Sequence, residues 1–68
     1  MKNIYTILVT VEETSMLEKL FNMYRIGLND WDKTKPLDFQ GAKVINYTIV
    51  CEENVFTSIV NTVVESRV

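Results

Sequence analysis

The sequence predicts a small α+β domain, a two-layer βαββα sandwich in which two helices cover one face of a sheet. Two stretches, Ile4–Val11 and Val44–Cys51, alternate in the manner of strands, and each has an apolar side. The segment that follows each of them carries apolar residues at helical spacing. These observations give the order strand, helix, short strand, strand, helix.

The first strand is expected in the middle of the sheet, because both of its sides carry aliphatic residues. One side is apolar without interruption and should face the core: Tyr5, Ile7, Val9 and Val11. The other side mixes aliphatic and hydroxyl side chains: Ile4, Thr6, Leu8 and Thr10. Such a mixture suits neither a dry interior nor an ordinary wetted surface.

The first helix is predicted to begin at a capping box, in which Ser15 and Glu18 satisfy each other's backbone amides. Its buried stripe recurs at three- and four-residue spacing and consists of Leu17, Leu20, Phe21 and Tyr24. Met16 and Met23 widen the apolar arc to one side. This helix should therefore contact more than its own sheet.

The end of the first helix is marked by a glycine. We place the last helical turn near Ile26 and expect Gly27 to adopt the left-handed conformation that commonly follows a helix. Leu28 would then fold back onto Met23, as in a Schellman motif.

From residue 29 to residue 43 the apolar pattern fails, and turn residues prevail. Within this segment Pro36–Phe39 could form a short edge strand that turns through Gln40–Ala42 into the next strand. If that strand forms, the two long strands run antiparallel; if the segment is a loop, they run parallel through a right-handed crossover. We favour the antiparallel arrangement, because a loop of this length exceeds the usual linker of about 2–6 residues.

The second long stretch, Val44–Cys51, repeats the pattern of the first. Its core side is expected to be apolar: Ile45, Tyr47, Ile49 and Cys51. Its other side is mixed: Val44, Asn46, Thr48 and Val50. Beyond it, polar pairs separate three apolar doublets: Val55-Phe56, Ile59-Val60 and Val63-Val64. Only a helical period gathers such doublets on one side, so a second helix is predicted there.

Parts of this pattern resemble ACT-type regulatory domains. Thr6–Phe21 and Gly27-Leu28-Asn29 resemble the opening of such domains, and Val44–Val64 resembles their third strand and second helix. The resemblance implies a ferredoxin-like sandwich, here lacking the last strand and with a second strand that is short or absent. It also implies dimerisation, with amino acids or other small molecules bound between subunits. The family usually has a glycine where this chain has Ser15.

The length and composition of the chain exclude several ways of stabilising it. Sixty-eight residues make one domain, which hides only about 60% of the surface that its unfolded form exposes. Cys51 is the only cysteine and histidine is absent, so neither a disulfide nor a structural zinc site can form within one chain. Oligomerisation is then the expected source of added stability.

The charge and the first residues limit the setting and the partners. A net charge of −2 gives no reason to expect a nucleic-acid partner. The first apolar run is short and broken by threonines, which predicts neither a signal peptide nor a membrane span. A cytoplasmic location is expected, and the lone thiol agrees with it.

Catalytic chemistry has little basis in this sequence. Without histidine the usual general base is missing, and Cys51 has no base partner and is expected to be a buried, inert thiol. The acidic doublets Glu12-Glu13 and Glu52-Glu53 each precede a helix, and we interpret them as complements to helix N-terminal dipoles. Parallel strands would gather these carboxylates at one end of the sheet, and antiparallel strands would separate them. No enzyme activity, cofactor or metal is expected.

The first candidate site is the mixed face of the two long strands: Ile4, Thr6, Leu8, Thr10, Val44, Asn46, Thr48 and Val50. This face lies opposite the helices in a two-layer fold, and nothing else in the chain can cover it. Its aliphatic residues would form an apolar patch of the size that usually marks an interaction surface. A missing last strand would also leave the first strand with an unpaired edge. We therefore expect a homo-oligomer; the other interpretation is an ordinary exposed sheet face.

The second candidate site is a group of aromatic and basic residues in and around the linker: Arg25, Trp31, Lys33, Lys35 and Phe39. Tryptophan and arginine are frequent hot-spot residues at protein interfaces, and an aromatic ring beside cations can also stack a base. The alternative interpretation is that Trp31 and Phe39 only cover one end of the core.

The preferred function is that of a small non-enzymatic interaction or regulatory protein, which self-associates and acts by binding a protein partner, for example as an inhibitor. The alternative is a regulatory or sequestering domain that binds an amino acid or a small nucleotide between subunits. The resemblance motivates this alternative, while Ser15 and the acidic linker count against it.

Overall fold

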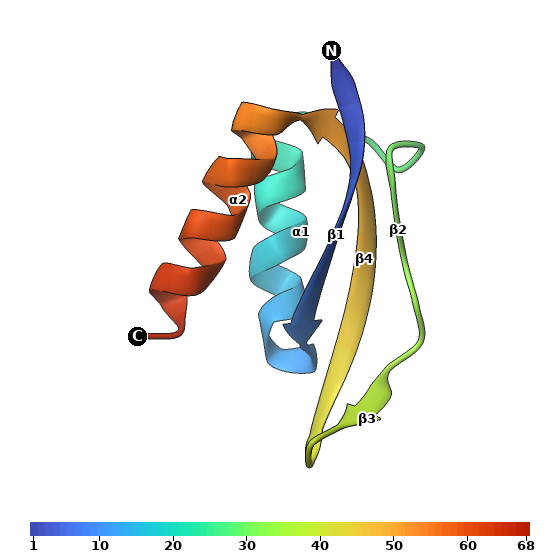
Figure 1. The fold of residues 1–68 in the computed structure, drawn as a ribbon, viewed down its shortest axis with the longest axis vertical. Coiled ribbons are helices and arrows are strands. Elements are labelled where there is room, and N and C mark those ends of the chain that lie inside the picture. Colours follow the sequence, from blue (N-terminus) through green and yellow to red (C-terminus); the bar gives the residue numbers. More distant parts are fainter.

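Two helices lie on one face of a four-stranded antiparallel sheet (Figure 1). The structure is a computed structural model that describes residues 1–68. In chain order its elements are β1 (Lys2–Thr10), the 3₁₀ turn η1 (Val11–Glu13), α1 (Thr14–Met23), β2 (Trp31–Lys33), β3 (Leu37–Phe39), β4 (Ala42–Glu52) and α2 (Glu53–Ser66). The predicted α+β class, with its two helices, is confirmed.

Strand β4 is the centre of the sheet. Its residues Val44–Glu52 pair with the whole of β1 on one side, and its other side pairs with the short strands β2 and β3, always antiparallel. The preferred antiparallel relation of the two long strands is thus confirmed. The expectation that β1 is central is wrong: β1 is an edge strand, because only the longer β4 can bond neighbours on both sides.

Strand β2 was absent from the prediction, which treated its residues as loop. Two of its three residues are exposed charges, so only Trp31 signals a side that faces the helices. Backbone bonds extend the pairing beyond the strand, from Val50 N–H to the Asp30 carbonyl (2.7 Å) and from Thr34 N–H to the Asn46 carbonyl (3.0 Å). Pro36 lacks an amide hydrogen and separates β2 from β3. The short strand expected at this proline is confirmed, beginning at Leu37.

Helix α1 begins one residue earlier than predicted, and the capping box belongs to the 3₁₀ turn that precedes it. The first strand was expected to continue to Val11, but it ends at Thr10, and Val11 enters the 3₁₀ turn with its side chain exposed. The Thr10 amide donates to Glu13 Oε1 at 2.8 Å. The predicted Ser15–Glu18 box does not form. Thr10 and Glu13 have the same spacing and form the box instead, while Glu18 is bonded to Tyr47 and Lys33.

Helix α1 ends in a Schellman motif centred two residues before the predicted glycine. Arg25 adopts the left-handed conformation, with φ of 59°. Its amide bonds the Asn22 carbonyl at 3.2 Å, and the Ile26 amide bonds the Phe21 carbonyl at 2.8 Å. Ile26 is folded into the core by this turn, whereas Tyr24, which was predicted in the buried stripe, is exposed.

Because a side chain at positive φ is strained by about 1–2 kcal/mol, we expect Arg25→Gly to stabilise the protein. The gain should be about 0.5–1 kcal/mol, since glycine also loses more backbone entropy on folding. Urea denaturation followed by circular dichroism measures it, with Arg25→Ala as the control that keeps the strain. A glycine variant less stable than the alanine variant would contradict the assigned conformation.

The core lies between the helices and the sheet and combines the apolar side of β1 and β4 with one stripe from each helix. Its buried members are Val9, Leu17, Leu20, Phe21, Ile26, Ile45, Tyr47, Ile49, Cys51, Ile59 and Val63. Met16 packs against this cluster, but Met23, which was expected to widen the apolar arc, is 71% exposed. The predicted core sides of both long strands are confirmed apart from Val11.

Strands β3 and β4 form a tight hairpin that extends beyond the ends of both helices (Figure 1). Its two central residues, Gln40 and Gly41, have φ of 50° and 83°. Positive φ at both positions is the requirement of a type I′ turn, whose twist matches that of the paired strands. The hairpin therefore presents both of its faces to solvent at this end of the molecule.

Candidate functional site

The eight residues of the first candidate site share the face of the sheet that points away from the helices. We call this the open face. The register of β1 against β4 pairs them directly: Ile4 with Val50, Thr6 with Thr48, Leu8 with Asn46 and Thr10 with Val44. The structure thus places them together, as their alternation predicted, and their role in self-association stays a prediction.

The open face carries exposed apolar side chains at both ends. Ile4 is 72% exposed and Leu8 about half exposed. Val44 departs from the expectation of an uncovered face, since it is only 8% exposed. It is flanked by Thr10 on β1 and Leu37 on β3, which the two pairings bring to its sides. Val44 is therefore the packed base of this surface.

Strand β3 adds two residues to the open face that sequence reasoning did not assign to it. Leu37 pairs with Val44 and Phe39 with Ala42, so both side chains lie on the side opposite the helices. Each is about half exposed. The signal that could have found them is the alternation Leu37-Asp38-Phe39, which follows a proline and precedes a tight turn. With Leu8, they give the lower half of the open face a second apolar patch.

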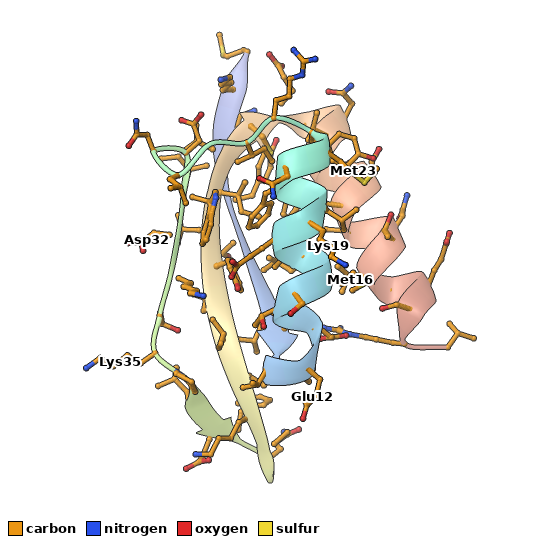
Figure 2. The ribbon with its side chains drawn as sticks, turned by 180° about the vertical axis from the view of Figure 1, so that it is seen from behind. Glu12, Met16, Lys19, Met23, Asp32 and Lys35 are labelled. Atoms are coloured by element: carbon orange, nitrogen blue, oxygen red, sulfur yellow. The ribbon has the colours of Figure 1, made fainter.

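Of the second candidate site, the structure brings together only Trp31 and Lys33. Trp31 faces the helices and packs on Phe21, with ring centroids 5.1 Å apart. Lys33 is bonded to Glu18, Phe39 lies on the open face, and Arg25 lies at the end of α1. Figure 2 shows Asp32 and Lys35 extending away from the helices. Trp31 and Lys33 lie two residues apart on β2 and so share the helix side of the sheet, where both lie against the Tyr47 ring. The other members lie on other segments: Arg25 follows α1, Lys35 lies between β2 and β3, and Phe39 is on β3.

A polar cluster lies at the boundary between α1 and the sheet. The Tyr47 hydroxyl donates to Glu18 Oε2 at 2.6 Å, and Lys33 Nζ donates to the same oxygen at 2.9 Å. The pKa of Glu18 is lowered mainly by the hydrogen bond from Tyr47 and, to a smaller extent, by that from Lys33. The pKa of Tyr47 is raised mainly by burial and, to a smaller extent, by its bond to Glu18. A carboxylate held ionised and a phenol held protonated join α1 to the sheet, and neither is poised for proton transfer at neutral pH.

The end of α2 is tied to the start of α1 by a bidentate ion pair. Arg67 Nε lies 2.7 Å from Glu13 Oε2, and Arg67 Nη2 lies 2.9 Å from Glu13 Oε1. The same Nη2 also donates to the Leu8 carbonyl at 3.2 Å. We call this arrangement the Arg67 latch. It joins the C-terminal end of α2 to Leu8 and Glu13, which are 59 and 54 residues away in the sequence.

The Arg67 guanidinium, with help from the Thr10 amide, lowers the pKa of Glu13 from 4.5 to about 2. A carboxyl with a depressed pKa in the folded state stabilises the protein above its unfolded pKa and loses this contribution as pH falls toward the folded value. We expect Glu13→Gln to reduce stability at pH 7 by about 1–2 kcal/mol, a value discounted because Arg67 is half exposed. The difference from wild type should shrink between about pH 5 and pH 2. Denaturant titrations at several pH values measure it, and a difference independent of pH would contradict the ion pair.

A small open hollow lies at the end of the molecule opposite the latch. Its volume is about 90 Å³, and its charged lining residues are Lys2, Arg25, Asp30 and Glu52. Ligand pockets for small molecules usually measure about 300–1,000 Å³. Within one copy, this hollow is too small to enclose a nucleotide.

The remaining reactive groups take structural positions. Cys51 is buried, and burial raises the pKa of its thiol. The antiparallel strands separate the acidic doublets Glu12-Glu13 and Glu52-Glu53 to opposite ends of the sheet, and no cluster of potential metal ligands is present. In this structure these groups contribute packing and charge.

The open face and the exposed edge of β1 are therefore the features that lie outside the protein's own packing. Neither helix has the length and apolar character that crossing a bilayer requires. No protein-family model, curated protein or solved structure matches this chain.

Proposed function

We propose that this protein is a non-enzymatic interaction or regulatory protein, which self-associates and presents the open face of its sheet to a protein partner, for example as an inhibitor. The observation that carries the proposal is a sheet face with Ile4, Leu37 and Phe39 exposed and no element packed on it. Leu37 and Phe39 also form a patch with Leu8 at one end of this face, and exposed apolar patches usually mark a contact with another molecule.

The small size of the domain supports self-association. A chain of 68 residues without a disulfide has a thin margin of stability, which a second copy adds to by mass action. A standard interface buries about 800 Å² on each partner, or about a sixth of this protein's 4885 Å² of accessible surface. The open face and its neighbouring edge are the apolar surface available for it.

The arrangement of elements also supports a finer fold assignment. We propose a ferredoxin-like sandwich that lacks the strand beside β1. The order β1-β4-β2, with both helices on one face, is the order such a sandwich would keep without that strand. A small-ligand role, which the resemblance to ACT-type domains implied, receives less support because the only hollow is small.

The self-association part of the proposal is tested at Ile4. We expect Ile4→Glu to weaken association at least about 100-fold, because it places two carboxylates in a surface that becomes desolvated. The matched control is Met23→Glu, since Met23 is as exposed as Ile4 but lies on the outer side of α1 (Figure 2). Multi-angle light scattering should show a dimer for wild type and control and a monomer for Ile4→Glu. Equal masses for all three proteins would contradict the proposal.

A further inference from the structure

The two edges of the sheet differ in how far they are protected from pairing. The edge formed by β2 and β3 is interrupted at Pro36 and carries several charges, and Asp32 Oδ1 accepts the Lys33 amide at 2.8 Å. Short strands, prolines and charges are the usual means of blocking an edge. The edge formed by β1 runs unbroken over nine residues without a proline. It is the edge that remains open to another strand.

Only the second half of the β1 edge is capped by the protein itself. The Leu8 carbonyl accepts from Arg67, and the Thr10 amide donates to Glu13. Backbone groups alternate in direction along an antiparallel strand, so those of Lys2, Ile4 and Thr6 point outward in the same way. No other strand pairs with them. The open part of the edge is therefore Lys2–Thr6, and the Arg67 latch sets its limit.

An apolar row on α2 runs beside this edge. Phe56 stacks on Tyr5 of β1, with ring centroids 4.3 Å apart and planes inclined by 6°. Val60 and Val64 follow Phe56 at successive helical turns and so lie on the same side of α2. Val60 is half-buried and Val64 half-exposed. A strand added at β1 would meet apolar side chains on the helix side as well as Ile4 on the open face.

We propose that a second copy of this chain pairs with the first along β1, antiparallel and about a two-fold axis at Ile4, so that the two sheets become one. This inference rests on the proposed self-association and specifies its geometry. Ile4 would exchange both backbone hydrogen bonds with Ile4 of the second copy, and Lys2 would do so with Thr6 of the second copy. This register uses the outward backbone groups of Lys2, Ile4 and Thr6 and stops at the latch of each copy.

Two features of the antiparallel, two-fold arrangement favour a second copy at this edge. The antiparallel relation places Lys2 opposite a threonine, so like charges do not meet, whereas a parallel relation would place the two lysines side by side. The two-fold axis also brings the α2 rows of both copies to the same side of the joined sheet, where apolar surface can meet apolar surface. The open faces then form one continuous surface for a partner.

Amide hydrogen exchange tests the pairing directly. In wild-type protein at a concentration where light scattering gives the dimer mass, we expect the Ile4 and Thr6 amides to exchange about 100-fold more slowly than in diluted monomer. The Trp31 amide is the internal control. The Asp30 carbonyl and the Thr34 amide bond β4, so the backbone amide of Trp31 points away from β4, on the other edge of the sheet. Its exchange rate should therefore be the same in the dimer and in the monomer.

Two variants give an independent test. Ile4→Pro removes an outward amide that has no partner within the copy, so the copy keeps its own hydrogen bonds and loses the dimer. Phe39→Glu distinguishes edge pairing from a dimer in which the two open faces stack on each other. Phe39 lies on the open face but on a strand far from the β1 edge, so edge pairing predicts a dimer and stacking predicts a monomer. A dimeric Phe39→Glu supports edge pairing.

Three outcomes would overturn the inference. A dimer whose Ile4 and Thr6 amides exchange as fast as that of Trp31 contradicts the edge pairing but leaves the proposed self-association intact. A monomeric Phe39→Glu variant, measured under conditions where the wild type is a dimer, also contradicts the edge pairing and leaves the self-association intact. A wild type that is monomeric at all concentrations contradicts both proposals. The exchange measurement on wild type decides the matter even where a variant fails to fold.

Discussion

Phe21→Ala is expected to remove a large part of the stability of this protein. Phe21 is 1% exposed and contacts the rings of Trp31 and Tyr47, with centroids 5.1 and 5.7 Å away. Truncating a buried phenylalanine costs about 3–5 kcal/mol, through lost transfer free energy and the cavity left behind. A domain of this length has about 3–10 kcal/mol in total. The variant should therefore be largely unfolded at the lower end of that range.

Urea denaturation followed by far-ultraviolet circular dichroism measures this loss. Phe21→Leu is the matched control, because it keeps an apolar side chain of similar volume and should lose less than about 1.5 kcal/mol. If Phe21→Ala were as stable as the wild type, the aromatic cluster would not be the part of the core that joins α1 to β2 and β4.

Glu18→Ala is expected to have the second largest effect, a loss of about 2–3 kcal/mol, because it removes a charge-assisted bond and leaves the Tyr47 hydroxyl without a partner. The distance of 2.6 Å between Tyr47 Oη and Glu18 Oε2 is that of a strong bond to a carboxylate. Lys33 contributes less, because it is half exposed and such pairs are worth at most about 1 kcal/mol.

A double-mutant cycle with Glu18→Ala and Tyr47→Phe separates the pair from its surroundings. We expect a coupling energy of about 1.5–3 kcal/mol, the usual range for a hydrogen bond to a charged group. Lys33→Met is the control and should change stability by less than about 1 kcal/mol. A coupling energy near zero would mean that Glu18 does not hold α1 to the sheet.

The sequence predicted those elements whose apolar residues recur regularly. The long strands, both helices and the eight open-face residues follow from periods that packing enforces, since a shift of one residue would exchange the two sides of a strand. Strand β2 has no such period, because two of its three residues, Asp32 and Lys33, are charged and exposed at the edge of the sheet. Its existence is decided by the length of β4, which no local pattern in residues 31–33 reveals.

Local rules failed where the sequence offered two equivalent signals. Thr10 and Ser15 each precede a glutamate at capping distance, and the choice between them depends on Arg67 and Tyr47, which bind the two glutamates from distant segments. Gly27 was the obvious helix stop, yet Arg25 adopts the positive φ because ending there lets Ile26 reach the core. In both cases a tertiary contact outweighs the local preference.

Small-angle X-ray scattering of the wild-type protein tests the central claim most directly, which is that a second copy covers apolar surface that one copy leaves exposed. Between about 10 μM and 1 mM, a range that would reveal even weak association, we expect the forward scattering to approach twice the mass of one 7.9 kDa chain. A mass of one chain at every concentration, with the size of a particle whose Cα radius of gyration is 11.6 Å, would contradict it.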